Sequence, residues 1–452
     1  MSPGRRALAV AFVLMLPFVT PRIRAADEIQ YYASLRSLAF DRDLDYENEY
    51  SYFYARDPGG LQAFKGTFLE RRDPVSGRHI NFAPLGAALL WSPFFAVAHV
   101  GVLAARALGA SVAADGYSFP YLAAVSLASA LYAFAGLLLI HAMLVREGGF
   151  DDRIAALGVL GAWLATPVVY YMTIAPGFGH APSLFAVSLL LWLSFRARRE
   201  GAAADFLLCG LTGGLAGLVR EQDALFLVFP AGLIAWDFVR DRAVGRALRR
   251  AALLALGALL VLAPQLAAYK TLTGRFGPST FVTRKLSWSS PHAFEVLFDP
   301  GHGLFLWSPI LFAATAGLIL WACRRRDVVA ALLVLLVVLQ VWINGAIDSW
   351  HMAGAFGARR FIAATPAFAF GLAALLATLR RRAGEAAAAL FVLVCAWWNL
   401  SLMVQFGLKL MDRQRLDWPH VAVNQVIEVP RHLIRAGALF FADRERLARE
   451  GQ

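Results

Sequence analysis

The chain has 452 residues, of which 59% are hydrophobic and only 16% are charged. Soluble globular proteins carry about a quarter charged residues, so this composition excludes a soluble enzyme and indicates a polytopic membrane protein. The formal net charge is +12, but the arginines gather in short clusters between apolar runs, a pattern that orients membrane helices and does not indicate a nucleic-acid partner.

The first predicted element is the apolar run 7–19, which follows Arg5 and Arg6. This run has the length of a signal-peptide core and also that of a short membrane segment, and both alternatives stay open. Either one exports the residues that follow. Asp27 and Glu28, in the stretch RAADEIQYY, are therefore predicted to lie on the outer face at the membrane edge.

Charge-poor runs long enough to cross a bilayer, roughly 17 to 25 residues, recur along the rest of the chain. They are 83–105, 118–145, 154–195 (which must turn back on itself), 251–269, 303–323, 328–347, 361–379 and 386–408. A weaker pair, 206–219 and 224–236, is short for spans, and a buried core helix is its alternative. The predicted fold class is an all-α polytopic membrane protein with about 11–13 transmembrane helices.

The arginine clusters mark the predicted cytoplasmic side. They lie at 5–6, 196–199, 240–250, 324–326 and 380–382. The spans of the second half agree with this topology. Those before 196 do not, so either the run 83–105, interrupted by Pro93, fails to cross or a boundary between 106 and 117 is missed. The predicted organisation is one transmembrane domain, 1–408, with a first periplasmic loop at 22–82, further external loops at 270–302 and 348–360, and a short external tail, 409–452, that ends in an amphipathic helix.

Familiar soluble-enzyme motifs are missing from the sequence. It has no CxxC or HExxH spacing and no phosphate loop of the GxGxxG or GxxxxGK type, so nucleotide chemistry of the usual soluble architecture is not expected. Alternating acids in the first loop could gather around a metal, but a solvated loop is the favoured interpretation, and no metal or other cofactor is predicted. Those acids are Asp41, Asp43, Asp45, Glu47 and Glu49.

Several stretches, taken in order, resemble bacterial membrane glycosyltransferases of the GT-C superfamily, the group related to protein O-mannosyltransferases and to the lipid A aminoarabinose transferase. The stretches are ADEIQYYASLRSL, FDRDLDYENEY, NFAPLGAALLWSPFF, TPVVYYMTIAPGFGHAPSLF, GLAGLVREQDAL, GHGLFLWSPIL and WHMAGAFGARRFIAATPAF. The resemblance covers roughly residues 26–368. Its usual feature is an acidic pair directly after the first apolar segment. One departure is NFAPLG, where many relatives carry a His-Pro-Pro element.

The resemblance implies an enzyme of the bacterial inner (cytoplasmic) membrane whose active site faces the periplasm. It would transfer one sugar, a hexose or a pentose, from a polyprenyl-phosphate carrier to an unidentified envelope acceptor with inversion. The base of the family maps onto Asp27, with Glu28 beside it. Helix capping is the competing account of this pair, and because neighbours on a helix point about 100° apart, only one of the two is expected to enter a cavity.

The leaving phosphate needs cations, and the external segments supply candidates because a guanidinium can hold two phosphate oxygens. The predicted phosphate ligands are Arg36, Arg78, Arg284, Lys285, Arg359 and Arg360. The predicted sugar or acceptor pocket takes Tyr31, Tyr32, His180 and Trp350, because sugars stack on aromatic rings and a polar residue at membrane depth usually faces a cavity. A transporter or flippase for a lipid-linked glycan is the alternative function.

Overall fold

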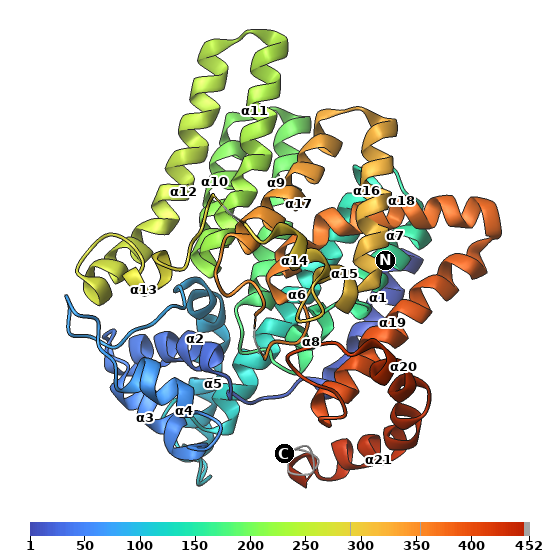
Figure 1. Ribbon diagram of the computed structural model, residues 1–452. Helices are drawn as coiled ribbons and strands as arrows, with labels where there is room; N and C mark the ends of the chain where they lie inside the picture. Colours follow the sequence, from blue (N-terminus) through green and yellow to red (C-terminus); the bar gives the residue numbers. More distant parts are fainter. Residues whose placement is uncertain (290, 353, 447–452) are drawn as a thin grey trace. The chain divides into compact units, whose positions relative to one another are not determined.

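The regular structure of this protein is helical in the computed structural model, which describes residues 1–289, 291–352 and 354–446 (Figure 1). An isolated antiparallel β-bridge pairs Arg72 with His79. Eight helical stretches of the described chain are long and apolar enough to cross a membrane, namely Gly86–Ala107 (α5), Phe119–Arg146 (α6), His180–Glu200 (α9), Glu221–Asp241 (η4 and α11), Val244–Thr273 (α12), Val328–Gly345 (α17), Arg359–Ala383 (η5 and α18) and Glu385–Gly407 (α19). The predicted all-α polytopic membrane protein is confirmed.

Four further predicted runs form helices shorter than 18 residues, which explains why this count is lower than the predicted number of spans. They are α1 (Pro3–Met15), α7 (Asp152–Leu164), α10 (Ala203–Val219) and α16 (Pro309–Arg325). The run 154–195 is divided into α7, α8 (Val168–Thr173) and α9, which begins at His180, and its predicted turn back on itself stays a prediction. The predicted amphipathic helix of the tail is α21 (Glu428–Ala442), preceded by α20 (Trp418–Val426). Its exposed apolar side chains include Leu433, Ile434 and Phe441.

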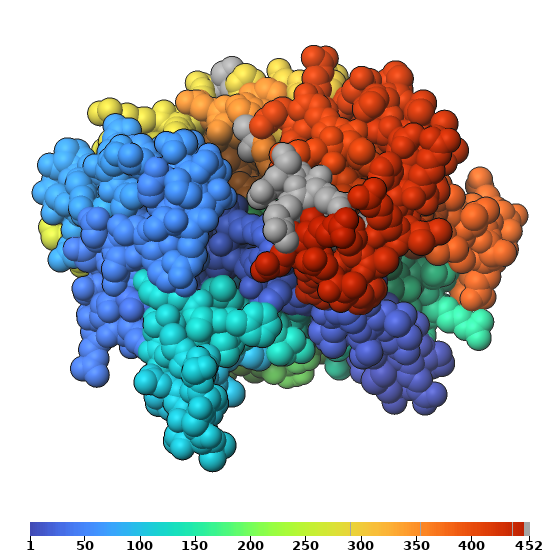
Figure 2. All heavy atoms as spheres, turned by 90° about the horizontal axis from the view of Figure 1, so that it is seen from below, coloured from blue at the N-terminus to red at the C-terminus, as the bar shows by residue number. Residues whose placement is uncertain are grey.

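The chain divides into two compact units, and each is described by itself. The α2 unit comprises Val10–Leu139 and Tyr171–Leu286, and the α18 unit comprises Met1–Ala9, Ile140–Tyr170 and the chain from Ser287 onward. The α2 unit holds the whole predicted first periplasmic loop, which forms α2 (Ala26–Arg36), the π-helical turn η2 (Ser37–Asp41), α3 (Glu47–Arg56), α4 (Gln62–Phe64) and η3 (Lys65–Leu69). In Figure 2 this segment is a continuous lobe in shades of blue.

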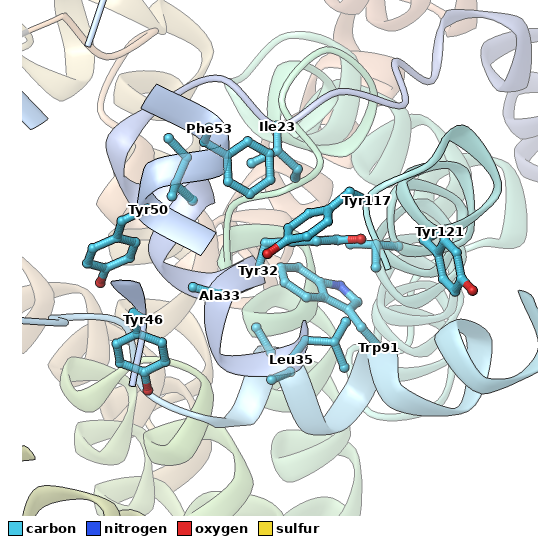
Figure 3. Packing of buried hydrophobic residues seen from close by; sticks show 14 of the residues in the cluster. Ile23, Tyr32, Ala33, Leu35, Tyr46, Tyr50, Phe53, Trp91, Tyr117 and Tyr121 are labelled. Carbon is cyan, nitrogen blue, oxygen red and sulfur yellow. The ribbon is translucent and has the colours of Figure 1, made fainter. Parts of the chain in front are cut away.

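An aromatic core fixes the first loop to the membrane helices of its unit (Figure 3). Tyr32 of α2, Tyr50 of α3 and Trp91 of α5 are fully buried. Their polar atoms are satisfied, since the Tyr32 hydroxyl donates to the Gly116 carbonyl, the Tyr50 hydroxyl donates to the Ile80 carbonyl (3.0 Å) and Trp91 Nε1 donates to Ser129 Oγ (2.8 Å). Buried rings with paired polar groups add apolar burial without desolvation cost, so α2 is held in one place.

The α18 unit is organised around a close crossing of α16 and α18. A Cβ at Gly317 or Gly371 would overlap the backbone of the other helix, and one at Gly371 would also lie 2.7 Å from Leu318 Cβ. Small residues at such a crossing let two membrane helices approach until their backbones touch. The α18 helix (Thr365–Ala383) also packs on α7 and α19, and α14 (Ala293–Phe298), α15 (Leu304–Trp307) and η5 (Arg359–Ala364) lie in the same unit.

Gly371→Ala is expected to destabilise the protein by about 1–3 kcal/mol, the usual cost of forcing one extra methyl into a packed interface. Thermal unfolding of the purified protein in detergent measures the effect. Gly101→Ala is the matched control, because Gly101 also lies inside a helix but has nothing within 4 Å of its Cβ position. An equal melting temperature for the two variants would contradict the close crossing.

Candidate active site

The acidic pair occupies the first turn of α2. The helix begins at Ala26, so Asp27 and Glu28 are its second and third residues, and Arg36 lies in its last turn. Acids near a helix N-terminus and bases near its C-terminus both interact favourably with the helix dipole. This distribution of charge, together with the buried positions Ile29, Tyr32 and Ala33, explains why the segment folds as a helix directly after the first apolar run.

Glu28 is the capping residue of α2. Its Oε2 accepts hydrogen bonds from the backbone N–H groups of Arg24 (2.9 Å) and Ala25 (3.0 Å), which is the carboxylate half of a capping box. The side chain is only 4% exposed, and Oε1 has no hydrogen-bond partner within the described chain. Burial raises the pKa of this carboxyl from 4.5 to about 7, although the two amide hydrogen bonds lower it.

Asp27 is the more accessible member of the pair. It is partly exposed whereas Glu28 is buried, in keeping with the 100° rotation between neighbours on a helix. The capping account that competed with catalysis in the sequence therefore applies to Glu28. Its accessibility leaves Asp27 as the acid that can meet a substrate.

The first turns of α2 lie directly on the loop that leads into α9. A Cβ at Gly177 would lie 2.5 Å from Ile23 Cδ1 and 3.1 Å from Glu28 Oε1, and a Cβ at Gly179 would lie 2.8 Å from the Tyr31 ring. Only glycines allow this approach, since any side chain would displace α2. The next residue along the chain, His180, is therefore held near the acidic end of α2.

His180 is buried and bonded to a residue that the sequence did not single out for the site. Its Nδ1 lies 3.0 Å from Nη1 of Arg220, which donates the hydrogen bond. Arg220 Nη2 also donates to Gln222 Oε1 (3.2 Å), and the Ser183 hydroxyl donates to the buried Asp223 carboxylate. The turn 220–223 thus pairs with α9. One sequence signal could have indicated this contact. Two polar turns, one directly before His180 and one at 220–223, interrupt an otherwise apolar region.

The two predicted pocket tyrosines differ. Tyr31 is partly buried, with its ring edge-on to Trp91 at 6.4 Å between centroids. Tyr32 is fully buried in the aromatic core and offers no open ring face for a sugar. The roles of both tyrosines in a sugar pocket stay predictions.

Arg36 is engaged within the first loop. It forms ion pairs with Asp41 and with Glu49, the latter at 3.0 Å between Arg36 Nη1 and Glu49 Oε1, and its guanidinium lies 4.7 Å from the Tyr117 ring centroid. The Glu49 side chain is fully buried, and burial raises its pKa to about 7 even though the Arg36 hydrogen bond lowers it. A phosphate would have to displace these acids, so we leave Arg36 out of the proposed phosphate site.

Arg78, Arg284 and Lys285 form no ion pair with an acid in the part of the chain that the structure describes. They lie on two segments of the α2 unit that touch each other. The Ser76 hydroxyl donates to the Leu272 carbonyl (2.6 Å), and Lys285 Nζ lies 5.8 Å from the Phe82 ring centroid. These two contacts join the segment around Arg78 to the chain that runs from α12 to Lys285.

The remaining predicted residues belong to the α18 unit. Arg359 and Arg360 begin η5, and Arg360 Nη2 donates to Ser349 Oγ at 3.2 Å. Trp350 is partly buried, with its ring 5.5 Å from that of His292. These three residues are thus near one another along one short external segment, and their predicted roles stay predictions.

The acids of the first loop are engaged with neighbouring groups of the same loop. Asp43 Oδ1 accepts from the Ser37 hydroxyl (2.7 Å), Glu47 pairs with His79 and Arg72, and Glu49 pairs with Arg36. In the parts of the chain that the structure describes, no group of three or more histidine, cysteine, aspartate and glutamate side chains is arranged to hold a metal.

The helical membrane bundle with its acid-bearing helix α2 defines an all-α polytopic membrane protein. No family model and no curated protein matches the sequence. Two crystal structures of ArnT from Cupriavidus metallidurans are similar to it, each at 15% sequence identity and over 99% of this chain. The form bound to undecaprenyl phosphate has a TM-score of 0.56 over 73% of its own chain, and the apo form has 0.50 over 74%. At this identity the likeness confirms the fold expected from the sequence.

The raised pKa of Glu28 predicts a pH-dependent stability. The folded protein holds the Glu28 proton more tightly than the unfolded chain, so the free energy of unfolding falls as pH rises from about 4.5 to about 7. Glu28→Gln removes this titration and keeps an oxygen acceptor for the cap. As the pH rises from about 4.5 to about 7, Glu28→Gln should therefore become more stable relative to the wild type. Unfolding in detergent at a series of pH values measures this difference in unfolding free energy. Parallel curves would contradict the assignment.

Arg36→Ala is expected to destabilise the protein by about 3 kcal/mol, because it leaves the buried Glu49 carboxylate without its cation. The double variant Arg36→Gln with Glu49→Gln should recover most of this loss. Arg56→Ala is the control from the neighbouring helix, since Arg56 is exposed, and it should change stability by less than about 0.5 kcal/mol. Equal unfolding free energies for Arg36→Ala and Arg56→Ala would refute the internal role of Arg36.

Proposed function

We propose that this protein is an integral membrane glycosyltransferase that moves one sugar from a polyprenyl-phosphate carrier to an envelope acceptor. The observation that carries the proposal is the different burial of the two acids at the start of α2. Glu28 is buried in the helix cap, whereas Asp27 is partly exposed. The similarity to ArnT supports it further, because one of the similar structures holds undecaprenyl phosphate, a carrier of the proposed class.

Asp27 is proposed as the general base. Its carboxylate takes the proton of an acceptor hydroxyl while the hydroxyl oxygen attacks the anomeric carbon of the donor. The bond between that carbon and the phosphate oxygen breaks on the opposite face, its electron pair stays on the phosphate, and the configuration inverts. The products are the glycosylated acceptor, polyprenyl phosphate and a protonated Asp27, which returns its proton to water.

The leaving phosphate gains negative charge as the bond breaks, so cations placed beside it stabilise the transition state. Arg78, Arg284 and Lys285 are the proposed source within the α2 unit, because they form no ion pair among the described residues. Arg359 and Arg360 stay candidates from the α18 unit. Arg220 donates a hydrogen bond to His180, next to the Gly179 backbone that faces Tyr31, and we propose that this pair positions the loop under α2. The active site would face the periplasm of a bacterial inner membrane.

Asp27→Asn should lower the rate of sugar transfer by at least about 100-fold, the usual worth of a general base, and leave insertion and melting temperature unchanged. Asp57→Asn is the matched control, because Asp57 is an exposed acid of the same loop whose hydrogen bond from the Gly60 amide (3.0 Å) an asparagine can accept. Mass spectrometry of envelope glycans from a deletion strain identifies the sugar and acceptor, and the same strain complemented with each variant gives the first readout.

Transfer must then be measured with purified protein in detergent, where donor and acceptor share one phase. A flippase has nothing to transport in that assay, so product formation there separates the enzyme from the transporter. Transfer by Asp27→Asn at the wild-type rate would rule out Asp27 as the base. Wild-type protein that restores the glycan in cells but forms no product in detergent with the identified donor and acceptor would favour the transporter.

A further inference from the structure

The α18 unit contains a cavity that the proposed reaction does not use. The cavity is lined by α16, by α18 and by the turn 148–151 that joins α6 to α7, and its volume is about 410 Å³. Pockets that bind small molecules start at about 300 Å³, so a phosphate-bearing headgroup fits inside. All of the lining residues belong to the α18 unit.

The glycine crossing of α16 and α18 determines where this cavity lies. The helices touch at Gly317 and Gly371, and the cavity extends from there toward the C-terminal ends of both. Its α16 wall consists of Gly317, Leu320, Trp321 and Arg324, which share one helix face because they are spaced by three and four residues. Leu320 and Trp321 make the floor of the cavity apolar. Arg324, nearer the C-terminal end of α16, makes its mouth basic.

The mouth carries more positive charge than the protein neutralises. The lining includes Arg324, Arg380 and Arg381 but only one acid, Asp151, whose Oδ1 lies 2.9 Å from Arg380 Nη1. Arg324 has no ion pair within the described chain, and the Arg381 side chain donates one long hydrogen bond, to Thr378 Oγ1 at 3.4 Å. Two guanidinium groups thus stand at the mouth without an internal anion.

A hydrocarbon surface leads to this mouth. Phe312, Ile319 and Leu320 of α16 are each about half exposed, at 55%, 48% and 54%. From Phe312 to Arg324 the helix rises about 18 Å, close to half the thickness of a bilayer core of about 30 Å. An acyl chain lying on these side chains would bring its headgroup to the level of the arginines.

We infer that this cavity binds the headgroup of an anionic phospholipid. Its phosphodiester would accept hydrogen bonds from Arg324 and Arg381, and one acyl chain would lie along α16. The basic clusters place the site in the cytoplasmic leaflet by the positive-inside rule, and basic pockets between helices on that side favour anionic lipids. A soluble anion would use the arginines but not the apolar floor.

Native mass spectrometry of delipidated full-length protein tests this inference, with phosphatidylglycerol and phosphatidylcholine of equal chains as probes. The wild type should bind phosphatidylglycerol about tenfold more tightly than phosphatidylcholine. The double variant Arg324→Gln with Arg381→Gln should lose this preference, since each arginine near an anionic lipid contributes roughly a fivefold effect. This readout is independent of sugar transfer, so it can fail while the proposed function holds.

The matched control is Arg326→Gln with Arg382→Gln, which removes one arginine from each of the same two clusters. Neither residue lines the cavity, so this variant should keep the preference. Ala377→Trp fills the cavity without changing its charge and should abolish the preference even if the arginine variant inserts poorly. Equal losses in the two double variants, no preference in the wild type, or displacement of the lipid by inorganic phosphate at millimolar concentration would each overturn the inference.

Discussion

The hydrogen bonds from the backbone amides of Arg24 and Ala25 to Glu28 decide where the first external helix starts. A shift of the helix by one residue would rotate every side chain of α2 by about 100°. Asp27 would then take the buried capping position, Tyr32 would leave the aromatic core, and Arg36 would lose Glu49. The arrangement of the proposed site thus depends on which of two adjacent acids caps the helix.

Polar contacts downstream make this register rigid. Gln30 is buried, and its Oε1 accepts the Phe82 amide at 2.8 Å, while Asn81 Nδ2 donates to the Gln30 carbonyl at 3.1 Å. These bonds tie α2 to the segment that leads into α5. A general base works only when it is held within hydrogen-bond reach of its substrate. The same constraint explains why the loop under α2 carries glycines, since α2 rests on its backbone.

The fold was largely predictable from the sequence, whereas the division of roles within the site was not. Apolar runs such as 118–145 and 386–408 had to be helices, because lipid satisfies no backbone group, and they became α6 and α19. The acidic pair could be singled out from the sequence because it directly follows the first apolar run. Which acid would be buried depended on a single residue of helix register, and the pairing of Arg36 with Glu49 depended on a turn between two helices. Neither the helix register nor that turn can be predicted from composition or from hydrophobic periodicity.

The arginines of this protein fall into two groups. Some form internal ion pairs and stabilise the fold, and others form no ion pair within the described chain and are open to a ligand. Arg196 binds Asp205 and Arg250 binds Asp237 at 2.8 Å, so a phosphate that approached them would first have to separate an internal ion pair. That separation leaves a partly buried carboxylate without its cation, which costs more than the new contact returns. Arg284 and Arg324 form no ion pair within the described chain, so no internal ion pair would have to be separated before a phosphate bound them. An arginine in a membrane protein is thus a better candidate for binding phosphate when it forms no ion pair with a carboxylate, and this criterion selects Arg284 in the α2 unit and Arg324 in the α18 unit by the same physical argument.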